Sequence, residues 1–386
     1  MEPSELLEIV ARGEDGRNQF KLDFTNPTGL ASEIAAFANS EGGRIFIGVT
    51  DLGQIAGLTS KRVHDLNQLI STSASEQIRP PVGVLTENVK CDDKVVIVVH
   101  VPKGMARPYL DTVGAIWVKS GSDKRRVTAR EELQRMFQAA SLLHADEVPA
   151  EGTGFSDVDM DVFRDFYRQR FEADVEESGL ETPALLRNMN LMDESGRLNI
   201  AGLLLFGKSP STRYPVYNAK AVAFPGTELA DSEYLDSRDL NGTIPAIFTK
   251  AISFLSTHLV RIQGEQGFNS IGELEIPRLV LEELVANALI HRDYFISASI
   301  RLLVFRDRIE IVSPGHLPNN LTIANIKSGN SNIRNPILAS FATYMLPYRG
   351  LGSGILRALR AWPDIDFVDD RDGNTFKAIV RRKTLA

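Results

Sequence analysis

Residues 276–295 carry the most informative hydrophobic pattern of the chain. From 276 to 290 the sequence is apolar apart from Pro277, Arg278, Glu282, Glu283 and Asn287. A helix that is apolar nearly all round is a core helix. Glu283, Asn287 and His291 nevertheless recur every four residues, which places them on one face. Because an uncompensated carboxylate in a core costs several kcal/mol, this stripe needs either buried partners or a ligand.

The first 140 residues alternate between helical and strand patterns. Helical spacing marks residues 30–40 and 128–143, and Thr128 is the predicted N-cap of the second stretch. Strand patterns mark residues 42–58, with a turn at 51–53, and also residues 94–102 and 114–122. The run 94–102 is apolar enough to predict a largely buried strand. These elements predict one α/β unit.

The rest of the chain predicts a linker, a helical connector and a second α/β part. Residues 144–157 have the composition of a linker. Helical patterns follow at 158–175 and 182–190, and buried strands are predicted at 202–207 and 218–224. Beyond the helix of the polar stripe, residues 299–318 and 364–382 each predict a pair of strands. The fold class is therefore α/β (α+β), with predicted parts 1–143, 144–200 and 201–386.

Composition excludes several classes of protein. The chain has 386 residues, 43% hydrophobic and 24% charged, which is typical of a folded globular protein. No apolar run reaches the roughly 20 residues of a membrane span, and the acidic N-terminus lacks the pattern of a signal peptide. Cys91 is the only cysteine, so a disulfide framework and a thiolate zinc site are excluded. We therefore expect a cytoplasmic protein that does not associate with membranes.

The net charge is −7, but the segment from Lys103 to Arg130 is basic. It contains Lys103, Arg107, Lys119, Lys124, Arg125, Arg126 and Arg130 against Asp111 and Asp123. Such a run is either solvated surface or a surface that binds nucleic-acid phosphate.

Three segments after residue 280 fit one kind of site. Glu283 and Asn287, one helical turn apart, offer a carboxylate that could polarise water and an amide oxygen that suits Mg²⁺. Residues 313–318 form a tight turn after a strand. Gly350, Gly352 and Gly354 precede a helix, where backbone N–H groups can approach phosphate oxygens.

These segments resemble a known superfamily. "EELVANALIHRDY", "SPGHLP", "IRNPILA" and "RGLGSGI" together resemble the ATP-binding domain of the gyrase, histidine-kinase and MutL superfamily (GHKL, or Bergerat fold), and more closely its branch in predicted transcriptional regulators of prokaryotes. The resemblance implies ATP and Mg²⁺ as ligands, Glu283 as the catalytic, water-activating residue and Asn287 as the Mg²⁺ ligand. It implies further nucleotide-binding positions at Ser313, Gly315, Arg334, Gly350, Gly352, Ser353 and Gly354.

The chain departs from the superfamily pattern at one position of the base pocket. The superfamily has an Asp that receives the adenine amino group, whereas alignment on Gly315 puts Ser313 there. This departure predicts weaker discrimination between bases. Asn335 is expected to cap the helix that begins at Pro336. His291, together with Asp293, is expected to orient neighbouring groups or to cap the helix rather than to act on the nucleotide.

The N-terminal part contains the segments "GEDGRNQFKLDF", "IAAFANSEGGRIFIGVTDLGQIAGL" and "RPYLDTVGAIWVKSGSDKRRVTAREEL". Over most of residues 10–140 they resemble the Schlafen AlbA-type DNA-binding domain. It implies binding of DNA or RNA. The residues expected to face phosphate are Lys21, Lys119, Lys124, Arg125 and Arg126.

The two resemblances together imply a regulator in which ATP binding or slow hydrolysis controls nucleic-acid binding or assembly, with a homo-oligomer expected. Whether the chain is a weak Mg²⁺-dependent ATPase or only binds ATP stays open. One alternative is a Schlafen-like defence or processing nuclease gated by the ATPase domain. Another is a binding protein whose ATP pocket has decayed. Acidic positions of such nucleases match Glu14, position 19 and, less closely, Asp51, but position 19 is Gln. Because an amide brings no negative charge to hold a metal, binding without cleavage is expected.

Overall fold

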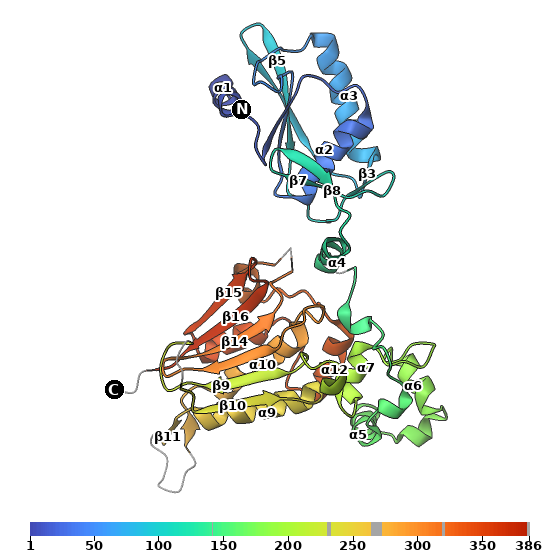
Figure 1. Ribbon diagram of the computed structural model, residues 1–386, viewed down its shortest axis with the longest axis vertical. Coiled ribbons are helices and arrows are strands. Elements are labelled where there is room, and N and C mark those ends of the chain that lie inside the picture. The colour runs from blue at the N-terminus through green and yellow to red at the C-terminus, as the bar shows by residue number, and fades with distance from the viewer. Residues whose placement is uncertain (141, 230–232, 264–271, 319–320, 384–386) are drawn as a thin grey trace. The chain divides into compact units, whose positions relative to one another are not determined.

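The computed structural model describes all residues except 141, 230–232, 264–271, 319–320 and 384–386 (Figure 1). The chain divides into two compact units, Met1–Leu143 and His144–Ala386. Both units combine helices with sheets, so the predicted mixed α/β class is confirmed. Within the described ranges, no helix has the length and apolarity that crossing a membrane would require.

The first unit is built on a four-stranded sheet with the order β1-β2-β5-β4. Its strands are β1 (Asn18–Lys21), β2 (Gly43–Ile47), β4 (Leu85–Cys91) and β5 (Lys94–Val101). β1 and β2 run parallel because the helix α2 (Pro27–Asn39) connects them, whereas the other neighbours are antiparallel. α2 and α3 (Ser60–Glu76) cover one face and α1 (Pro3–Arg12) packs on the other. β5 is therefore largely buried, as its apolar run predicts.

Smaller elements complete this unit. β3 (Ile78–Arg79) pairs with β6 (Leu110–Asp111), and β7 (Trp117–Ser120) pairs with β8 (Asp123–Arg126). The last helix, α4 (Arg130–Ala139), has Ala129 at its N-cap without a side-chain hydrogen bond. The prediction that Thr128 caps this helix is therefore wrong, because the helix begins one residue too late for the Thr128 hydroxyl to occupy the capping position.

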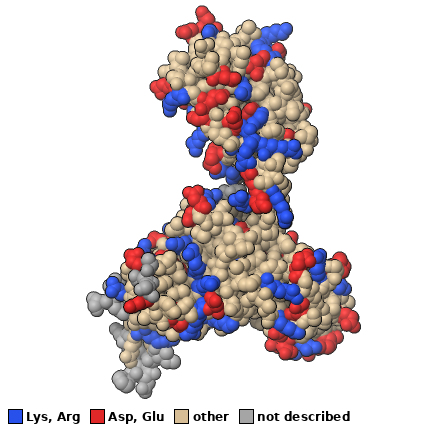
Figure 2. Space-filling model, in the orientation of Figure 1, with Lys and Arg blue, Asp and Glu red and all other residues tan. Residues whose placement is uncertain are grey.

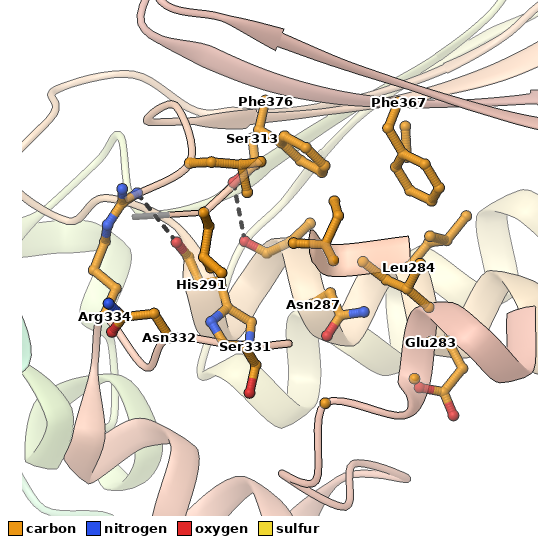
Figure 3. Close-up of a pocket in the computed structure, with 18 of the residues that line it drawn as sticks. Glu283, Leu284, Asn287, His291, Ser313, Ser331, Asn332, Arg334, Phe367 and Phe376 are labelled. Atoms are coloured by element: carbon orange, nitrogen blue, oxygen red, sulfur yellow. Dashed lines mark hydrogen bonds between the residues drawn. The ribbon is translucent and has the colours of Figure 1, made fainter. Parts of the chain in front are cut away.

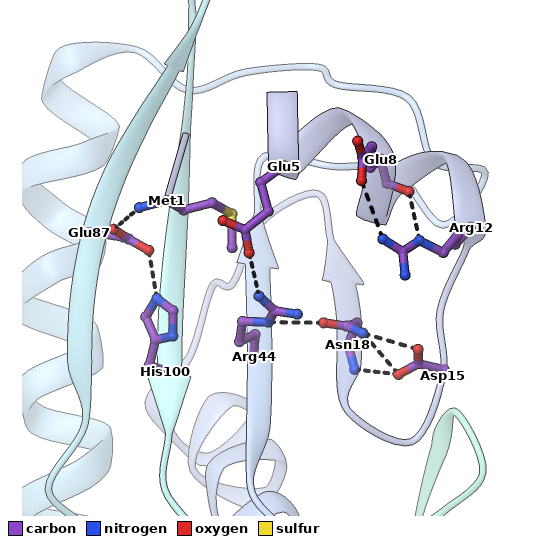
Figure 4. Close-up of polar contacts among 9 residues, drawn as sticks. All are labelled: Met1, Glu5, Glu8, Arg12, Asp15, Asn18, Arg44, Glu87 and His100. Carbon is purple, nitrogen blue, oxygen red and sulfur yellow. Dashed lines mark hydrogen bonds and ion pairs between the residues drawn. The ribbon is translucent and has the colours of Figure 1, made fainter. Parts of the chain in front are cut away.

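A series of polar contacts ties α1 to the sheet (Figure 4). Arg44 of β2 pairs with Glu5 of α1 at 3.2 Å and donates through Nε to Asn18 Oδ1 at 3.1 Å. The Asn18 amide in turn donates to the Asp15 carboxylate at 3.0–3.1 Å. These contacts fix the turn before β1, which also carries Glu14.

Short helices open the second unit. They are η1 (Ala145–Glu147), η2 (Phe155–Asp157), α5 (Met160–Phe171), η3 (Val175–Ser178), α6 (Thr182–Asn188), α7 (Ile200–Phe206) and α8 (Pro210–Arg213). The prediction of a strand at 202–207 is wrong, because these residues fall in and directly after α7. Every residue of α7 is buried, so its apolar run has no visible period. The deciding signal is the N-cap Asn199, whose side chain accepts from the N–H of Gly202 at 2.8 Å.

A six-stranded sheet with the order β10-β9-β13-β14-β16-β15 forms the rest of this unit. Its strands are β9 (Ala219–Ala223), β10 (Asp236–Leu240), β13 (Ile300–Val304), β14 (Arg308–Pro314), β15 (Ile365–Asp370) and β16 (Thr375–Arg381). β13 runs parallel to β9, and the other neighbours are antiparallel. The strand pairs predicted at 299–318 and 364–382 are confirmed. A short pair, β11 (Arg261–Ile262) and β12 (Glu273–Leu274), lies outside this sheet.

Two long helices, α9 (Ile244–His258) and α10 (Arg278–His291), cover one face of the sheet (Figure 1). A row of buried side chains crosses that face in register: Ala221, Leu302, Ile311, Ala378 and Phe367. The row gives α10 a continuous apolar surface to pack on, and α9 packs beside it, so α10 is apolar on more than one side.

The remaining helices are α11 (Ile323–Lys327), α12 (Pro336–Met345) and α13 (Gly354–Ala361). Asn335 occupies the N-cap position of α12, but its side chain makes no capping bond. Its amide instead donates to the carbonyls of Ile290 and Arg292, each at 2.8 Å. The prediction that the Asn335 side chain caps α12 is wrong, because the buried amide ties α12 to the end of α10.

Candidate functional site

One pocket of the second unit is lined by α10, the end of β14, the segment before α12 and the loop before α13 (Figure 3). It contains every nucleotide-site residue predicted from the sequence: Glu283, Asn287, Ser313, Gly315, Arg334, Gly350, Gly352, Ser353 and Gly354. His291 lines it as well, so the three-residue stripe of α10 faces one space. The fold therefore brings together the segments that the sequence predicted to share one site.

Glu283 is an acidic residue that lines the pocket, and it is only 2% exposed. Arg357 of α13 lies beside it, with 2.5 Å between Nη2 and Glu283 Oε1. The two groups form an ion pair without hydrogen-bond alignment: within the described part of the chain, Glu283 Oε1 lacks a hydrogen-bond donor and Arg357 Nε an acceptor. Burial raises the pKa of Glu283, and the charges of Arg357 and Arg349 partly offset this increase.

The glycine loop lies directly against this carboxylate. A Cβ atom at Gly354 would stand 2.4 Å from Glu283 Oε2 and 3.5 Å from the amide nitrogen of Asn287. A larger residue at position 354 would therefore displace the Glu283 carboxylate from the start of α13. Asn287 is partly exposed to the pocket, and its side chain makes no hydrogen bond within the described residues. Its amide oxygen is free to bind a ligand (Figure 3).

The other end of the pocket is held together by Arg334. Its guanidinium donates to the carbonyl of His291 at 3.3 Å and to that of His316 at 2.6 Å (the first bond is drawn in Figure 3). Gly315, between these segments, has φ +97°, and a Cβ there would lie 2.4 Å from Arg334 Nη1. Arg334 thus fixes the end of α10 against the turn that follows β14. The structure shows it holding this wall of the pocket through backbone carbonyls.

Ser313 and His291 are both engaged by the protein. The Ser313 hydroxyl is buried and donates to the carbonyl of Ala288 at 3.2 Å, which leaves its lone pairs to accept another bond. His291 Nε2 pairs with the hydroxyl of Tyr348 at 3.0 Å. Burial, with a smaller contribution from Arg334, lowers the pKa of His291 to about 4. His291 is therefore neutral at pH 7 and positions the Tyr348 side chain.

Sequence reasoning missed two groups of pocket residues. The apolar group consists of Leu284, Ile311, Phe367, Phe376 and Ala378, and the rings of its two phenylalanines stack with centroids 5.9 Å apart. The basic group consists of Arg349 and Arg357. Arg357 had a signal in the sequence, because it stands three residues after Gly354 and so shares a helix face with the start of α13. Phe367 and Phe376 had no such signal. Both β15 and β16 alternate between apolar and polar residues, and this pattern does not tell which apolar side chains line a pocket.

In the first unit, the acidic residue proposed for metal-dependent cleavage has backbone and amide donors. Glu14 Oε1 accepts from Gln19 Nε2 at 2.8 Å and from the N–H of Phe20 at 2.6 Å. Lys119 Nζ lies 2.5 Å from Gln19 Oε1. In the described ranges, no three His, Cys, Asp or Glu side chains come together as a set of metal ligands. Position 19 thus links Glu14 to a lysine.

The residues predicted to face phosphate differ in whether they form ion pairs within the first unit. Lys124 pairs with the buried Glu33 at 3.0 Å, and Arg125 pairs with Glu132 at 2.7 Å. Lys21 lies 4.0 Å from Asp51. Arg126 is exposed, and no ion pair is recorded for it among the described residues. Basic and acidic side chains intermingle over the visible face of this unit (Figure 2). Because Arg126 is exposed and outside these ion pairs, it is the predicted residue with the clearest access to a phosphate.

Three family models match parts of the chain. Residues 14–128 match the family model described as "Schlafen, AlbA_2", and residues 297–369 match the one described as "Putative ATP-dependent DNA helicase recG C-terminal". Residues 134–221 match a domain of unknown function. These matches confirm a Schlafen AlbA_2 domain in the N-terminal part and an ATPase-type domain in the C-terminal part. The second match contains the turn after β14 and the glycine loop but begins after Glu283 and Asn287, whose assignment therefore rests on the geometry.

Comparisons with whole proteins gave distant likenesses. A crystal structure of a Corynebacterium diphtheriae protein is 23% identical, with a TM-score of 0.48, over 98% of this chain and 81% of that one. The N-terminal domain of a RecG-related protein from Nitrosomonas europaea, described as a putative ATP-dependent DNA helicase, is 20% identical, with a TM-score of 0.23, over 34% of this chain and 96% of that one. A search of the curated proteins gave no match.

Proposed function

We propose that the pocket of the second unit binds ATP with Mg²⁺, as a GHKL-type domain of the Bergerat fold, and that this binding controls the attachment of the first unit to DNA or RNA. In this proposal residues 1–143 bind nucleic acid, 144–200 connect, and 201–386 bind the nucleotide. The observation that carries the proposal is the meeting of the α10 stripe, the turn after β14 and the glycine loop in one pocket.

The residues present suit a nucleotide at both ends of the pocket. The stacked phenylalanines and their aliphatic neighbours suit the faces of a base, and Ser313 offers a lone pair beside them. At the other end, the N-terminus of α13, Arg349 and Arg357 supply positive potential for phosphates. The free amide oxygen of Asn287 suits Mg²⁺, an oxygen-seeking ion that keeps several waters.

Bound Mg·ATP would supply an electrophilic terminal phosphate. Glu283 is the residue placed to accept a proton from an attacking water, since its carboxylate borders the phosphate end of the pocket. In the present arrangement Arg357 neutralises that carboxylate. A carboxylate held by a cation would be slow to accept a proton, which fits either slow hydrolysis or binding without hydrolysis.

A direct route for nucleotide control runs through the first residues of the second unit. His144 Nδ1 lies 3.0 Å from the carbonyl of Arg334, and Asp146 accepts from the N–H of Leu338 at 3.0 Å. The segment they contact lines the pocket at Ser331, Asn332 and Arg334. Any shift of this segment on ligand binding therefore acts on the residues that follow the first unit in the chain.

Two measurements on the full chain test the proposal. Titration calorimetry with ATP, ADP and GTP, with and without Mg²⁺, measures nucleotide binding. Fluorescence anisotropy with labelled duplex DNA, single-stranded DNA and RNA measures nucleic-acid binding, and its change on adding Mg·ATP measures control. A folded protein that binds none of the three nucleotides refutes the first part. Equal nucleic-acid affinity with and without saturating Mg·ATP refutes the second. A third measurement, sedimentation with and without Mg·ATP, tests the expected assembly into a homo-oligomer.

The nuclease alternative is disfavoured by the position of Gln19. Its amide donates to Glu14, and its carbonyl oxygen lies beside Lys119, so a cation stands where a second metal-binding carboxylate would be needed. Incubation with DNA and tRNA in the presence of Mg²⁺ or Mn²⁺ and ATP is the test. Cleavage that disappears in Glu14→Ala would establish the nuclease instead.

A further inference from the structure

We propose that Arg357 binds the terminal phosphate of ATP and, in its absence, holds Glu283 in an ion pair, so that one arginine both selects the triphosphate and restrains the water-activating carboxylate. This inference rests on the proposed nucleotide function and adds to it the residue that senses the triphosphate.

The first argument is the incomplete pairing of the two side chains. They touch at 2.5 Å, yet Glu283 Oε1 has no hydrogen-bond donor and Arg357 Nε has no acceptor within the described residues. A well-formed pair between arginine and a carboxylate uses two parallel N–H···O bonds and leaves neither group unsatisfied. Buried polar atoms without partners are costly. A phosphate oxygen on Arg357 together with a water on Glu283 would satisfy both.

The second argument is position. Glu283 Oε2 abuts the point where Gly354 begins α13, and Arg357 stands one turn further along the same helix. If Glu283 activates water for attack on the terminal phosphate, that phosphate must lie close to Glu283, which is where the guanidinium is found. The other nearby cation, Arg349, is exposed and lies before the glycine loop.

The third argument is competition between anions. A terminal phosphate carries more negative charge than a carboxylate and presents several acceptor oxygens to the planar guanidinium. Binding of the triphosphate therefore draws Arg357 away from Glu283 and frees the carboxylate as a base. A diphosphate, which lacks the terminal group, leaves the ion pair in place.

Calorimetry on the full chain at constant Mg²⁺ tests the selective role. Arg357→Ala should weaken ATP binding about 10- to 100-fold, since a charged hydrogen-bond partner is lost, while ADP affinity changes by less than about threefold. Arg357→Lys, which keeps the charge but not the fork, should recover part of the loss. Arg360→Ala is the matched control, because Arg360 is exposed on the same helix and does not line the pocket.

The restraining role has its own signature. Glu283→Gln removes the carboxylate that competes for Arg357, so it should increase ATP affinity several-fold and leave ADP affinity nearly unchanged. The increase should vanish when Arg357→Ala is also present. Circular dichroism of each variant confirms folding.

The outcomes separate the two levels of the proposal. If the folded wild-type chain binds no nucleotide, the proposed function fails and this inference fails with it. If the chain binds ATP but Arg357→Ala weakens ATP and ADP equally, or Glu283→Gln leaves ATP affinity unchanged, nucleotide binding stands and the role of Arg357 is refuted.

Discussion

Asp146 accepts a hydrogen bond at 3.0 Å from the backbone N–H of Leu338, 192 residues further along the chain. The carboxylate is fully buried, lies at the first turn of α12, and has one oxygen without a hydrogen-bond partner in the described structure. The N-terminus of a helix stabilises a negative charge, but burial away from water disfavours the charged form of the carboxylate. Burial is the larger effect and raises the pKa of Asp146 to about 6. The contact therefore couples the start of the second unit to the pocket wall in a pH-dependent way.

Asp146→Asn should remove a pH dependence from the stability of the second unit. Because the pKa is about 6 in the folded state and 3.8 in the reference state, the folded protein holds the proton more tightly. Stability is thus greatest below about pH 4 for this group and falls as the pH rises through 6, by roughly 3 kcal/mol at most. In the Asn variant, which can still accept from Leu338, this contribution should be absent.

Urea unfolding between pH 4 and 7 measures this effect, with Trp362 fluorescence reporting on the second unit in a Trp117→Phe background. Glu147→Gln is the matched control, since Glu147 is adjacent and exposed. An Asp146→Asn variant that keeps the wild-type slope against pH would contradict the assignment.

Asn287→Ala should weaken nucleotide binding only when Mg²⁺ is present. The amide oxygen of Asn287 is the proposed metal ligand, and its removal breaks no hydrogen bond among the residues that the structure describes. We expect a loss of about tenfold in Mg²⁺-dependent affinity and little change in EDTA, both measured by calorimetry. An equal loss in both conditions would mean that Asn287 contacts the nucleotide directly.

Ser313→Ala should change base selectivity modestly. The hydroxyl already donates to Ala288, so toward a base it can only accept, and one such bond contributes about 0.5–1.5 kcal/mol. ATP affinity should fall less than about tenfold relative to GTP in competition titrations. A strong preference for ATP that survives the substitution would show that another group reads the base.

Arg126→Glu should weaken nucleic-acid binding without unfolding the first unit. Because Arg126 is exposed, reversing its charge should weaken binding of the nucleic acid rather than disturb the fold. Each lost phosphate contact reduces the slope of log K against log salt by about 0.9 for duplex DNA. Lys90→Glu, at an exposed site outside the basic segment, is the control. If both substitutions weaken binding equally, the effect is one of net charge alone.

Charge reversal at Lys124 gives a less specific test of the same surface. It would place a second acid beside the buried Glu33, which Lys124 now neutralises at 3.0 Å. We expect a lower melting temperature as well as weaker binding. A Lys124→Glu variant as stable as the wild type would show that this ion pair contributes nothing measurable to the fold.

The sequence by itself determined features that depend on short spacings. The stripe of α10 follows from a four-residue period, the two strand pairs from alternation around turns, and the glycine loop from residues that are neighbours in the chain. These local patterns fix which side chains share a face. They were sufficient to predict the α/β class and to single out Glu283, Asn287 and the glycine loop. The resemblance to a known superfamily implied the other predicted pocket positions.

Tertiary structure decided whatever depends on contacts between distant segments. A buried apolar run at 202–207 carries no period, so packing and the Asn199 cap made it helical. The Asn335 side chain could either cap α12 or bond to the end of α10. In the folded protein its buried amide donates to carbonyls at the end of α10. No spacing in the sequence marked an ion-pair partner for Lys124, and the fold places Glu33 beside it. Arg357 and Glu283 became partners only when α13 packed on α10, because no spacing along the chain encodes which helix a side chain will meet.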